Sequence, residues 1–334
     1  MKRTPIAIFI YRRPEHTRRL LDSLARCARL DECDLFVFAD GPATPADAES
    51  VAAARAVVRE WAQRHTFEFR ESHENRGLAR SIVAGATELC QRAGRVIVLE
   101  DDLTLSPDFL SYILTSLDRY ESETSVHQIS GFVYPHTSRG SDDAFFLPFT
   151  SSWGWATWWR AWQSFAWDPA QIQDLQDADT RRRFDIDASY PWSKLLEDRV
   201  AGRNESWHVL WYWGVFRQAG LALYPRRSLV DVGGFDSTGT HGGRPEEALP
   251  QTRVENVRLQ DVLKFPAKIA TDSTALRSIV RFLRVWSHAT VPMGKRMRYW
   301  LSYRIEGLAT RLHKGLAAPL RYAALALRHQ NHKP

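Results

Sequence analysis

Three consecutive acidic residues, Glu100, Asp101 and Asp102, are the sharpest chemical signal in the sequence, and they directly follow the apolar run 95–99. Adjacent carboxylates repel one another unless a cation lies among them. Mg²⁺ and Mn²⁺ prefer carboxylate, water and phosphate oxygens, and often take only one or two protein carboxylates. The triplet therefore predicts a divalent metal that bridges the phosphates of a nucleoside diphosphate and stabilises it as a leaving group. The alternative interpretation is a solvated turn with helix-capping acids.

Other polar residues stand where further apolar runs end. Arg12 follows the first run and could reach a base or a phosphate, or belong to a solvated arginine pair. Asp40 ends the second run in an Asp-Gly pair that is also typical of turns. Asn75 and Arg80 flank the predicted start of a helix, where free backbone N–H groups favour anions, although a plain helix cap explains them as well. We predict that these four residues contact a nucleotide.

The candidate for the catalytic base is Glu205, in the polar turn 202–206 (GRNES). An inverting sugar transfer needs a carboxylate that takes the proton from the acceptor hydroxyl. Surface charge is the alternative for Glu205, and Asp231 and Asp236 are weaker candidates for the role. His241 lies in a glycine-rich stretch (TGTHGG) that could fold over the donor diphosphate.

Five of the thirteen tryptophans fall within residues 151–162 (SSWGWATWWRAW). The helical spacing of positions 155, 158, 159 and 162 predicts that Trp158, Trp159 and Trp162 face the core. Trp153 and Trp155 flank Gly154 ahead of that pattern. Because flat apolar rings suit sugar faces, these two are predicted to wall the acceptor pocket.

These residues need elements that bring them together, and the first 120 residues alternate strand and helix patterns. The apolar runs predict buried parallel strands, and Pro and N-cap signals predict the helices between them. Such an alternation predicts a doubly wound, mostly parallel sheet that binds ligands at the carboxyl ends of its strands. Strands are predicted at 5–11, 34–39, 66–71 and 95–99, and helices from Pro14, from Thr44-Pro45 to about Arg64, from about 78 to Gly94 and from Ser106-Pro107.

Composition limits the classes of protein that the chain can belong to. With 334 residues, 44% hydrophobic and 25% charged, it is an ordinary globular chain. Its three cysteines are odd in number and lack metal-ligand spacing, which favours a reducing compartment. No stretch reaches the roughly 18–20 apolar residues that span a bilayer, and a signal peptide is not expected. We therefore expect a cytoplasmic protein.

The positive net charge belongs to one segment of the chain. The whole chain carries +6, whereas residues 281–334 hold eleven Lys/Arg and one acid, Glu306, and so carry +10. The other 280 residues therefore carry −4. This distribution argues against a general nucleic-acid surface. It predicts that residues 281–334, a basic segment with aromatic residues, associate with an anionic membrane surface or pack back on the catalytic domain.

Taken together, the motifs resemble those of bacterial glycosyltransferases of the GT-A type, distantly similar to the N-acetylglucosaminyltransferase I group, which carries a Glu-Asp-Asp metal motif. The resemblance covers roughly residues 5–245. It implies a GT-A, Rossmann-like α/β fold and inverting transfer from a nucleotide-sugar, with uracil as the expected base. The motifs that carry it are IAIFIYRRPEHTRRLLDSL (6–24), NRGLARSI (75–82), VLEDDL (98–103), SSWGWATWWRAW (151–162) and the stretch 206–241.

The same resemblance implies roles for individual residues. Asp102 would be the direct metal ligand, while Asp101 and Glu100 would touch the ribose and neighbouring polar groups. Arg12 and Asp40 would hold the base, and Asn75 and Arg80 the nucleotide. In the animal enzymes the catalytic base lies in a Trp-Asp-Asp-Trp segment. The nearest stretch here is Glu-Ser-Trp-His-Val-Leu-Trp, which does not match it position by position.

We therefore expect residues 1–125 to bind the nucleotide-sugar, 126–250 to supply the acceptor and catalytic half, and 251–334 to form a basic helical tail. The expected reaction is metal-dependent transfer, with Mn²⁺ or Mg²⁺, of a hexosyl or N-acetylhexosaminyl group to a glycan or lipid-linked acceptor of a cell-surface polysaccharide. Three alternatives remain open: a sugar-phosphate nucleotidyltransferase, a non-catalytic carbohydrate-binding protein and a retaining transferase.

Overall fold

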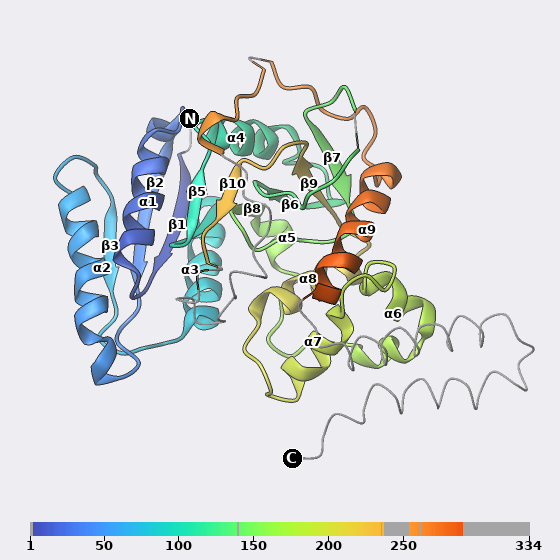
Figure 1. Cartoon of the computed structure of the whole chain (residues 1–334), viewed down its shortest axis with the longest axis horizontal. Coiled ribbons are helices and arrows are strands. Elements are labelled where there is room, and N and C mark those ends of the chain that lie inside the picture. Colours follow the sequence, from blue (N-terminus) through green and yellow to red (C-terminus); the bar gives the residue numbers. More distant parts are fainter. Residues whose placement is uncertain (1–2, 139, 235, 237–253, 261, 290–334) are drawn as a thin grey trace, which may run out of the picture. The chain divides into compact units, whose positions relative to one another are not determined.

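The computed structural model describes residues 3–138, 140–234, 236, 254–260 and 262–289 (Figure 1). The chain divides into two compact units, and the larger comprises residues 1–170 and 195–279. The smaller unit comprises residues 171–194 and 280–334. All the candidate site residues that the structure describes lie in the larger unit.

The larger unit is built on an eight-stranded sheet in the order β3-β2-β1-β4-β8-β6-β9-β7. Strands β3, β2, β1 and β4 are parallel, and β9 is parallel to β6, whereas β8 and β7 run antiparallel to their neighbours. A separate antiparallel pair joins β5 to β10. The strands are β1 Thr4–Ile10, β2 Cys33–Ala39, β3 Glu68–Glu71, β4 Arg95–Glu100, β5 Leu103–Leu105, β6 Val126–Ser130, β7 Ala144–Leu147, β8 Trp155–Trp158, β9 Leu221–Pro225 and β10 Val230–Val232.

Helices of the larger unit flank this sheet, which confirms the predicted α/β fold with a mostly parallel sheet (Figure 1). Among the described residues, no helix is both long and apolar enough to cross a membrane. The α-helices are α1 Pro14–Ala25, α2 Ala48–Trp61, α3 Leu78–Ala93, α4 Phe109–Arg119, α5 Trp159–Trp162, α6 Ala178–Phe184, α7 Trp192–Val200, α8 Trp207–Arg217 and α9 Ser273–Ala289. Short 3₁₀ helices occur at Leu30–Glu32, Pro45–Asp47, Ile172–Gln176 and Val254–Asn256.

The helix boundaries of the first half follow the predicted local signals. Pro14 is the first residue of α1, where its missing N–H has no helical partner to lose. Thr44 forms a capping box with Asp47, whose Oδ2 accepts from the Thr44 amide at 3.1 Å and hydroxyl at 2.8 Å. Gly94 ends α3 in the left-handed conformation at φ +83°. These local signals therefore place the start of α1, the 3₁₀ turn Pro45–Asp47 that precedes α2, and the end of α3.

The tryptophan-rich segment differs from its predicted conformation. Trp155–Trp158 form strand β8, and only Trp159–Trp162 form a short helix. Strand β8 lies between β4 and β6 and pairs with both, so its backbone groups are satisfied by its neighbours in the sheet rather than by its own turn. Pairing with distant strands thus overrides the helical spacing of the tryptophans.

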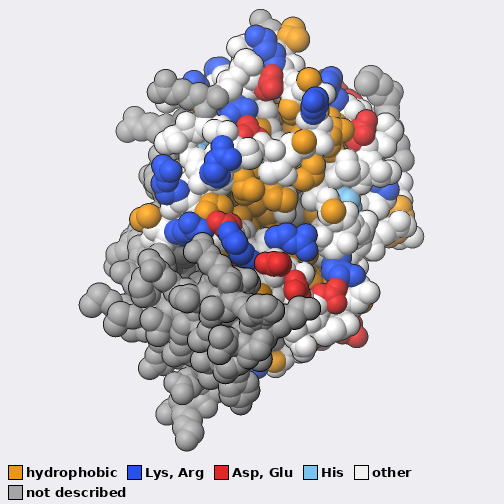
Figure 2. Space-filling view, turned by 90° about the vertical axis from the view of Figure 1, so that its right-hand side faces the viewer, with side chains coloured by type: hydrophobic (Ala, Val, Ile, Leu, Met, Phe, Trp, Pro, Cys, Tyr) orange, Lys and Arg blue, Asp and Glu red, His pale blue; other side chains and the backbone are white. Residues whose placement is uncertain are grey.

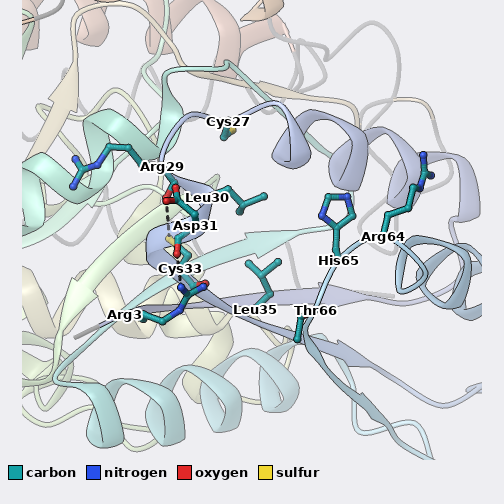
Figure 3. Close-up of a pocket in the computed structure, with 10 residues that line it drawn as sticks. All are labelled: Arg3, Cys27, Arg29, Leu30, Asp31, Cys33, Leu35, Arg64, His65 and Thr66. Carbon is teal, nitrogen blue, oxygen red and sulfur yellow. Dashed lines mark hydrogen bonds between the residues drawn. The ribbon is translucent and has the colours of Figure 1, made fainter. Parts of the chain in front are cut away.

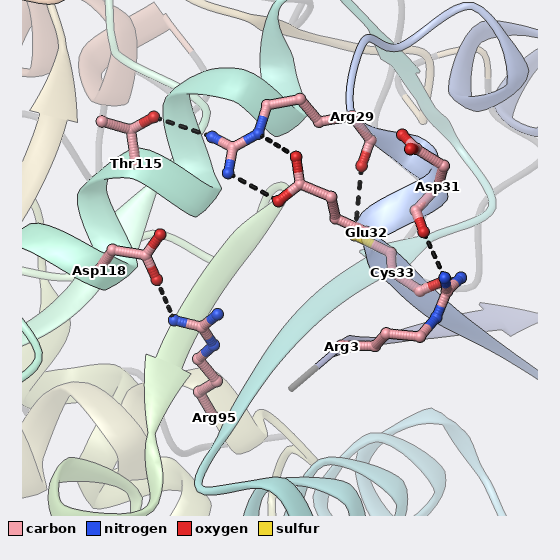
Figure 4. Close-up of polar contacts among 8 residues, drawn as sticks. All are labelled: Arg3, Arg29, Asp31, Glu32, Cys33, Arg95, Thr115 and Asp118. Carbon is pink, nitrogen blue, oxygen red and sulfur yellow. Dashed lines mark hydrogen bonds and ion pairs between the residues drawn. The ribbon is translucent and has the colours of Figure 1, made fainter. Parts of the chain in front are cut away.

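Ion pairs and hydrogen bonds lie near the amino ends of the strands, at the edge of the sheet opposite the predicted ligand site (Figure 4). Arg29 pairs with Glu32 at 2.7 Å and donates to the Thr115 hydroxyl at 3.0 Å. A cavity of about 470 Å³ opens at the same edge, beside Arg3, Leu35 and His65 (Figure 3). Because ligands of parallel sheets bind at the carboxyl ends, we assign this edge to stability.

One face of the molecule is shown in space-filling form in Figure 2. Hydrophobic side chains gather near its middle, and side chains of both charges are mixed around them. The described part of this face therefore presents no broad field of one sign.

Candidate functional site

The acidic triplet lies at the carboxyl end of β4, as its position in the sequence predicts. Glu100 is the last residue of β4 and pairs with Phe9 of β1, while Asp101 and Asp102 form the turn into β5. Burial, with smaller contributions from Asp102 and then Asp101, raises the pKa of Glu100 well above its usual value. Burial also raises the pKa of Asp101, and Arg13 opposes that rise. The site therefore concentrates negative charge where water does not stabilise it.

Arg13 is the cation that meets this charge. Its Nη2 atom contacts Oδ1 of Asp101 and lies 3.3 Å from Oδ2 of Asp102. The arginine side chain is 16% exposed, and the two carboxylates raise its pKa even though burial by itself lowers it. The second oxygen of Asp101 accepts from the backbone N–H of Tyr11 at 3.3 Å. Residues that precede α1 thus hold the turn that follows β4.

The residues at this turn fit a divalent cation that is held mainly by its substrate. Oδ1 of Asp102 is buried and has no hydrogen-bond partner among the described residues. In the part of the chain that the structure describes, no three His, Cys, Asp or Glu side chains form a closed metal-binding group. Mg²⁺-type ions commonly bind through one or two carboxylates plus substrate phosphates. An orphaned carboxylate oxygen beside two further acids suits that mode, in which Asp102 would be the protein ligand.

Strand β10, which is far from the acidic turn in the sequence, packs next to it in the fold. It lies beside β5 (Figure 1), and the backbone N–H of Gly233 donates to the carbonyl of Asp102 at 2.7 Å. A Cβ atom on Gly234 would lie 2.3 Å from Oδ2 of Asp102, so a side chain at this position would displace that carboxylate. Nε2 of His16, on α1, lies 3.1 Å from Oδ2 of Asp236. This places Asp236 close to the backbone of the acidic turn.

Asp40 directly follows β2 at the same edge and organises a neighbouring loop. Its carboxylate accepts from the backbone N–H groups of Gly41 at 3.0 Å, Arg76 at 2.8 Å and Gly77 at 2.9 Å. Asn75 donates from Nδ2 to the carbonyl of Gly41 at 2.8 Å. In this structure the two residues therefore fix the loop ahead of α3 through bonds to backbone groups.

Of the three remaining residues predicted to bind the donor, the structure describes Arg12 and Arg80 but not His241. Arg12 forms an ion pair with Asp47, and its side chain is 40% exposed. Arg80 is exposed on the first turn of α3. Their contacts with a nucleotide remain predictions. His241 falls within residues 237–253, which the structure does not describe.

Glu205 is exposed at the start of α8, directly before the N-cap Ser206. A Cβ atom on Gly77 would lie 3.9 Å from its Oε2 atom. The fold therefore brings this carboxylate to the loop that Asp40 holds, although the two residues are 165 positions apart. The predicted base thus lies at the ligand edge of the sheet.

The two tryptophans predicted for the acceptor have different surroundings. Trp155 is fully buried, with its ring 5.4 Å from that of Trp207 and 5.5 Å from that of Trp162. A ring without an exposed face cannot stack on a sugar, so we remove Trp155 from the acceptor site. Trp153 is partly exposed and packs edge-to-face on Phe132 at 4.7 Å. It keeps its predicted role.

Sequence reasoning missed several residues of the site. The sequence does not place Arg13, His16, Gly233 or Gly234 at the acidic turn. The available signals were a charged residue directly before the helix-opening Pro14 and an adjacent glycine pair after an apolar strand. Neither signal identifies the acidic turn as the partner, because the contacts join segments about 90 and 130 residues apart in the sequence.

Comparisons with known proteins agree with this architecture. The family described as Glycosyl transferase family 2 matches residues 6–178, slightly more than half of the chain. No curated protein sequence matches the chain significantly.

Three solved structures are among the similar ones, all at low identity. The mannosyltransferase PcManGT from Pyrobaculum calidifontis, in complex with GDP-Man and Mn²⁺, is 13% identical, with a TM-score of 0.37 over 65% of this chain and 73% of that one. Mouse xyloside xylosyltransferase 1 is 11% identical, with a TM-score of 0.33 over 56% and 76%. Staphylococcus aureus TarS is 12% identical, with a TM-score of 0.30 over 45% of this chain and 25% of that chain.

Proposed function

The chain belongs to glycosyl transferase family 2, and on that premise we propose that it transfers a sugar from a UDP-sugar to a glycan or lipid-linked acceptor with inversion at the anomeric carbon. The sugar is a hexosyl or N-acetylhexosaminyl group, and the product is part of a cell-surface polysaccharide. Family membership favours this reaction over nucleotidyl transfer to a sugar phosphate and over carbohydrate binding without catalysis.

The observation that carries the proposal is the acidic turn after β4. It combines three carboxylates, a buried Asp102 oxygen that no described residue satisfies, and contacts with Tyr11 and Arg13 of the loop that follows β1. This edge is where a parallel sheet binds nucleotides. Asp102 would hold Mn²⁺ or Mg²⁺, which when bound stabilises the charge that develops on the leaving diphosphate.

The protein residues bind and orient the donor around this turn. Arg13 and the Tyr11 amide fix Asp101, which together with Glu100 would contact the ribose. Asp40 and Asn75 hold the loop that precedes α3, so that the free amides of its first turn favour anionic groups. Arg12 and Arg80 add positive charge for the base and phosphates, and a contact of His241 with the diphosphate is part of the proposal, although that residue lies outside the described part of the chain.

The acceptor is activated by removal of its proton. Glu205 takes the proton as the acceptor oxygen forms a bond to the anomeric carbon and the bond to the diphosphate breaks. Trp153, which is partly exposed, supplies an apolar face for the acceptor sugar.

Calorimetric titration of the full chain with UDP, in the presence of Mn²⁺ and of EDTA, tests the donor site. We expect UDP to bind only with the metal, and Asp102→Asn to reduce its affinity at least about tenfold because the metal loses its protein ligand. Asp118→Asn, which changes an exposed carboxylate on α4, is the control that keeps wild-type affinity. Failure of UDP, GDP and dTDP to bind the folded protein with metal present would exclude a nucleotide-sugar donor.

The basic segment 281–334 is proposed to bring the enzyme, working at the cytoplasmic face, to an anionic membrane that carries a lipid-linked acceptor. Residues 290–334 lie outside the described part of the chain. Basic residues near such a surface each contribute about 1 kcal/mol, and salt screens them. Co-sedimentation with vesicles containing phosphatidylglycerol, but not with neutral vesicles, is expected. Equal sedimentation with both kinds of vesicle would contradict an electrostatic association.

A further inference from the structure

Arg13 joins the start of α1 to the proposed metal site. It is the residue directly before α1, and its carbonyl accepts from the amide and the hydroxyl of Thr17, both at 2.9 Å. These bonds fix its backbone, while its side chain reaches the acidic turn that follows β4. The start of α1 therefore holds the backbone of Arg13 in place, and this position sets where its guanidinium can reach.

Arg13 and Asp102 each keep one buried polar atom that has no hydrogen-bond partner among the described residues. Nη2 of Arg13 meets both Asp101 and Asp102, whereas Nη1 is buried and finds no hydrogen-bond partner in the described chain. Nη1 lies beside Gly234: a Cβ there would be 3.8 Å from it. Oδ1 of Asp102 is likewise buried and unsatisfied by any described residue. A free donor suits a phosphate oxygen, and a free carboxylate oxygen suits a divalent cation.

We propose that Arg13 serves as the internal counter-ion of the acidic turn, so that the divalent cation and the nucleoside diphosphate bind together and the cation alone binds weakly. Without nucleotide, the positive charge on Arg13 offsets the attraction of the carboxylates for a dication. Two phosphates bring negative charge that compensates for Arg13, and Nη1 becomes their donor. The inference rests on the proposed function, since it assumes a metal-dependent nucleotide donor.

Mn²⁺ binding to the full chain, followed by the electron paramagnetic resonance signal of free Mn²⁺ with and without UDP, tests this coupling. Wild-type protein should bind Mn²⁺ weakly alone and at least about tenfold more tightly with UDP. Arg13→Gln should bind Mn²⁺ alone about tenfold more tightly than wild type, because one positive charge next to a ligand carboxylate is removed. Its gain from UDP should shrink accordingly.

Three further variants separate charge from structure. Arg13→Lys keeps the charge and should retain the weak Mn²⁺ binding of the wild type. Asp101→Asn keeps Arg13 but removes one of its two carboxylate partners, so Mn²⁺ alone should bind more weakly still. Arg18→Gln removes an exposed arginine of α1 that pairs with Glu60, and it should match wild type throughout.

The outcomes also separate this inference from the proposed function. If Asp102→Asn abolishes Mn²⁺–UDP binding but Arg13→Gln binds Mn²⁺ alone no more tightly than wild type, the counter-ion role is wrong and the donor site stands. If Arg13→Gln does not fold, Mn²⁺ binding to Asp101→Asn that is unchanged or tighter overturns the inference. Absence of Mn²⁺ binding with UDP, GDP or dTDP in the wild type overturns both.

Discussion

At the scale of single residues, the site depends on carboxylates whose oxygens are divided between structural and chemical tasks. The Asp40 carboxylate accepts hydrogen bonds from three backbone amides. Asp101 is bound by Arg13 and the Tyr11 amide, whereas Asp102 keeps a buried oxygen that no described group satisfies. The carboxylates that are fully bonded position the loops, and the one that is not is available for a ligand.

Glu205→Gln tests the proposed base at this scale. Because an amide cannot accept the proton, kcat should fall about 10²–10⁴-fold while the KM for the donor stays close to wild type. The measurement is the release of UDP from the UDP-sugar that the wild type uses fastest. Glu49→Gln, an exposed residue of α2, is the control with unchanged kcat.

The competing base is Asp236, which pairs with His16 close to the acidic turn. Full activity of Glu205→Gln together with a loss in Asp236→Asn would transfer the role to Asp236. That result would also place the acceptor over the turn between β4 and β5.

At the scale of elements, the site is made where two loops approach closely at the carboxyl edge. Gly41, after β2, donates to the carbonyl of Glu74 at 3.3 Å, and Asn75 returns a bond to the Gly41 carbonyl. A Cβ on Gly41 would lie 2.5 Å from the carbonyl carbon of Glu74, which is backbone and cannot rotate away. The glycine is therefore required by the distance between the two loops.

Gly41→Ala should separate these loops. We expect it to lower the free energy of unfolding by about 1–3 kcal/mol, as overpacking does, and to weaken UDP binding about tenfold or more. Denaturant unfolding and calorimetry with UDP and Mn²⁺ measure the two effects.

Gly94→Ala is the matched control. Its Cβ would meet no described atom within 4 Å, but its φ of +83° strains any side chain by about 1–2 kcal/mol. It should therefore lose stability while it keeps the wild-type UDP affinity. Equal loss of affinity in both variants would show that the effect of Gly41→Ala comes from instability alone.

At the scale of the larger unit, the aromatic residues between the sheet and α8 form a continuous buried cluster. The rings of Trp155, Trp162, Trp207 and Trp211 lie 5.0–6.2 Å from their neighbours. His208 is carried into this interior on the first turn of α8, and its Nε2 lies 3.0 Å from the Thr150 hydroxyl. Burial lowers the pKa of His208 to about 4.

This histidine makes global stability depend on pH. Between pH 6.5 and 4 the unfolded chain binds a proton on His208 that the folded protein does not, so stability is complete above pH 6.5 and falls as the pH drops. The loss approaches about 3 kcal/mol near pH 4. His208→Gln, which keeps a partner for Thr150, should show a shallower loss of stability between pH 7 and 4 in denaturant titrations. The exposed His73→Gln should follow the wild-type curve, and an identical curve for His208→Gln would refute the assignment.

The sequence by itself determined the elements of the first half and the position of the acidic triplet. Pro14, Thr44 and Gly94 act within one helical turn, and the apolar run 95–99 needs burial whatever covers it, so local rules suffice. The role proposed for Asp102 rests on its residue type and on its place directly after a buried strand. These features depend on short-range geometry, which a sequence records directly.

Only the tertiary structure decided which residues share the site. Trp155 became a buried strand residue because β4 and β6 pair with it from both sides, and Arg13 meets Asp101 because β1 and β4 are neighbours in the sheet. Glu205 lies beside Gly77 and Gly233 beside Asp102 for the same reason. Such contacts depend on strand order and on the packing of distant segments, which spacing along the chain does not contain.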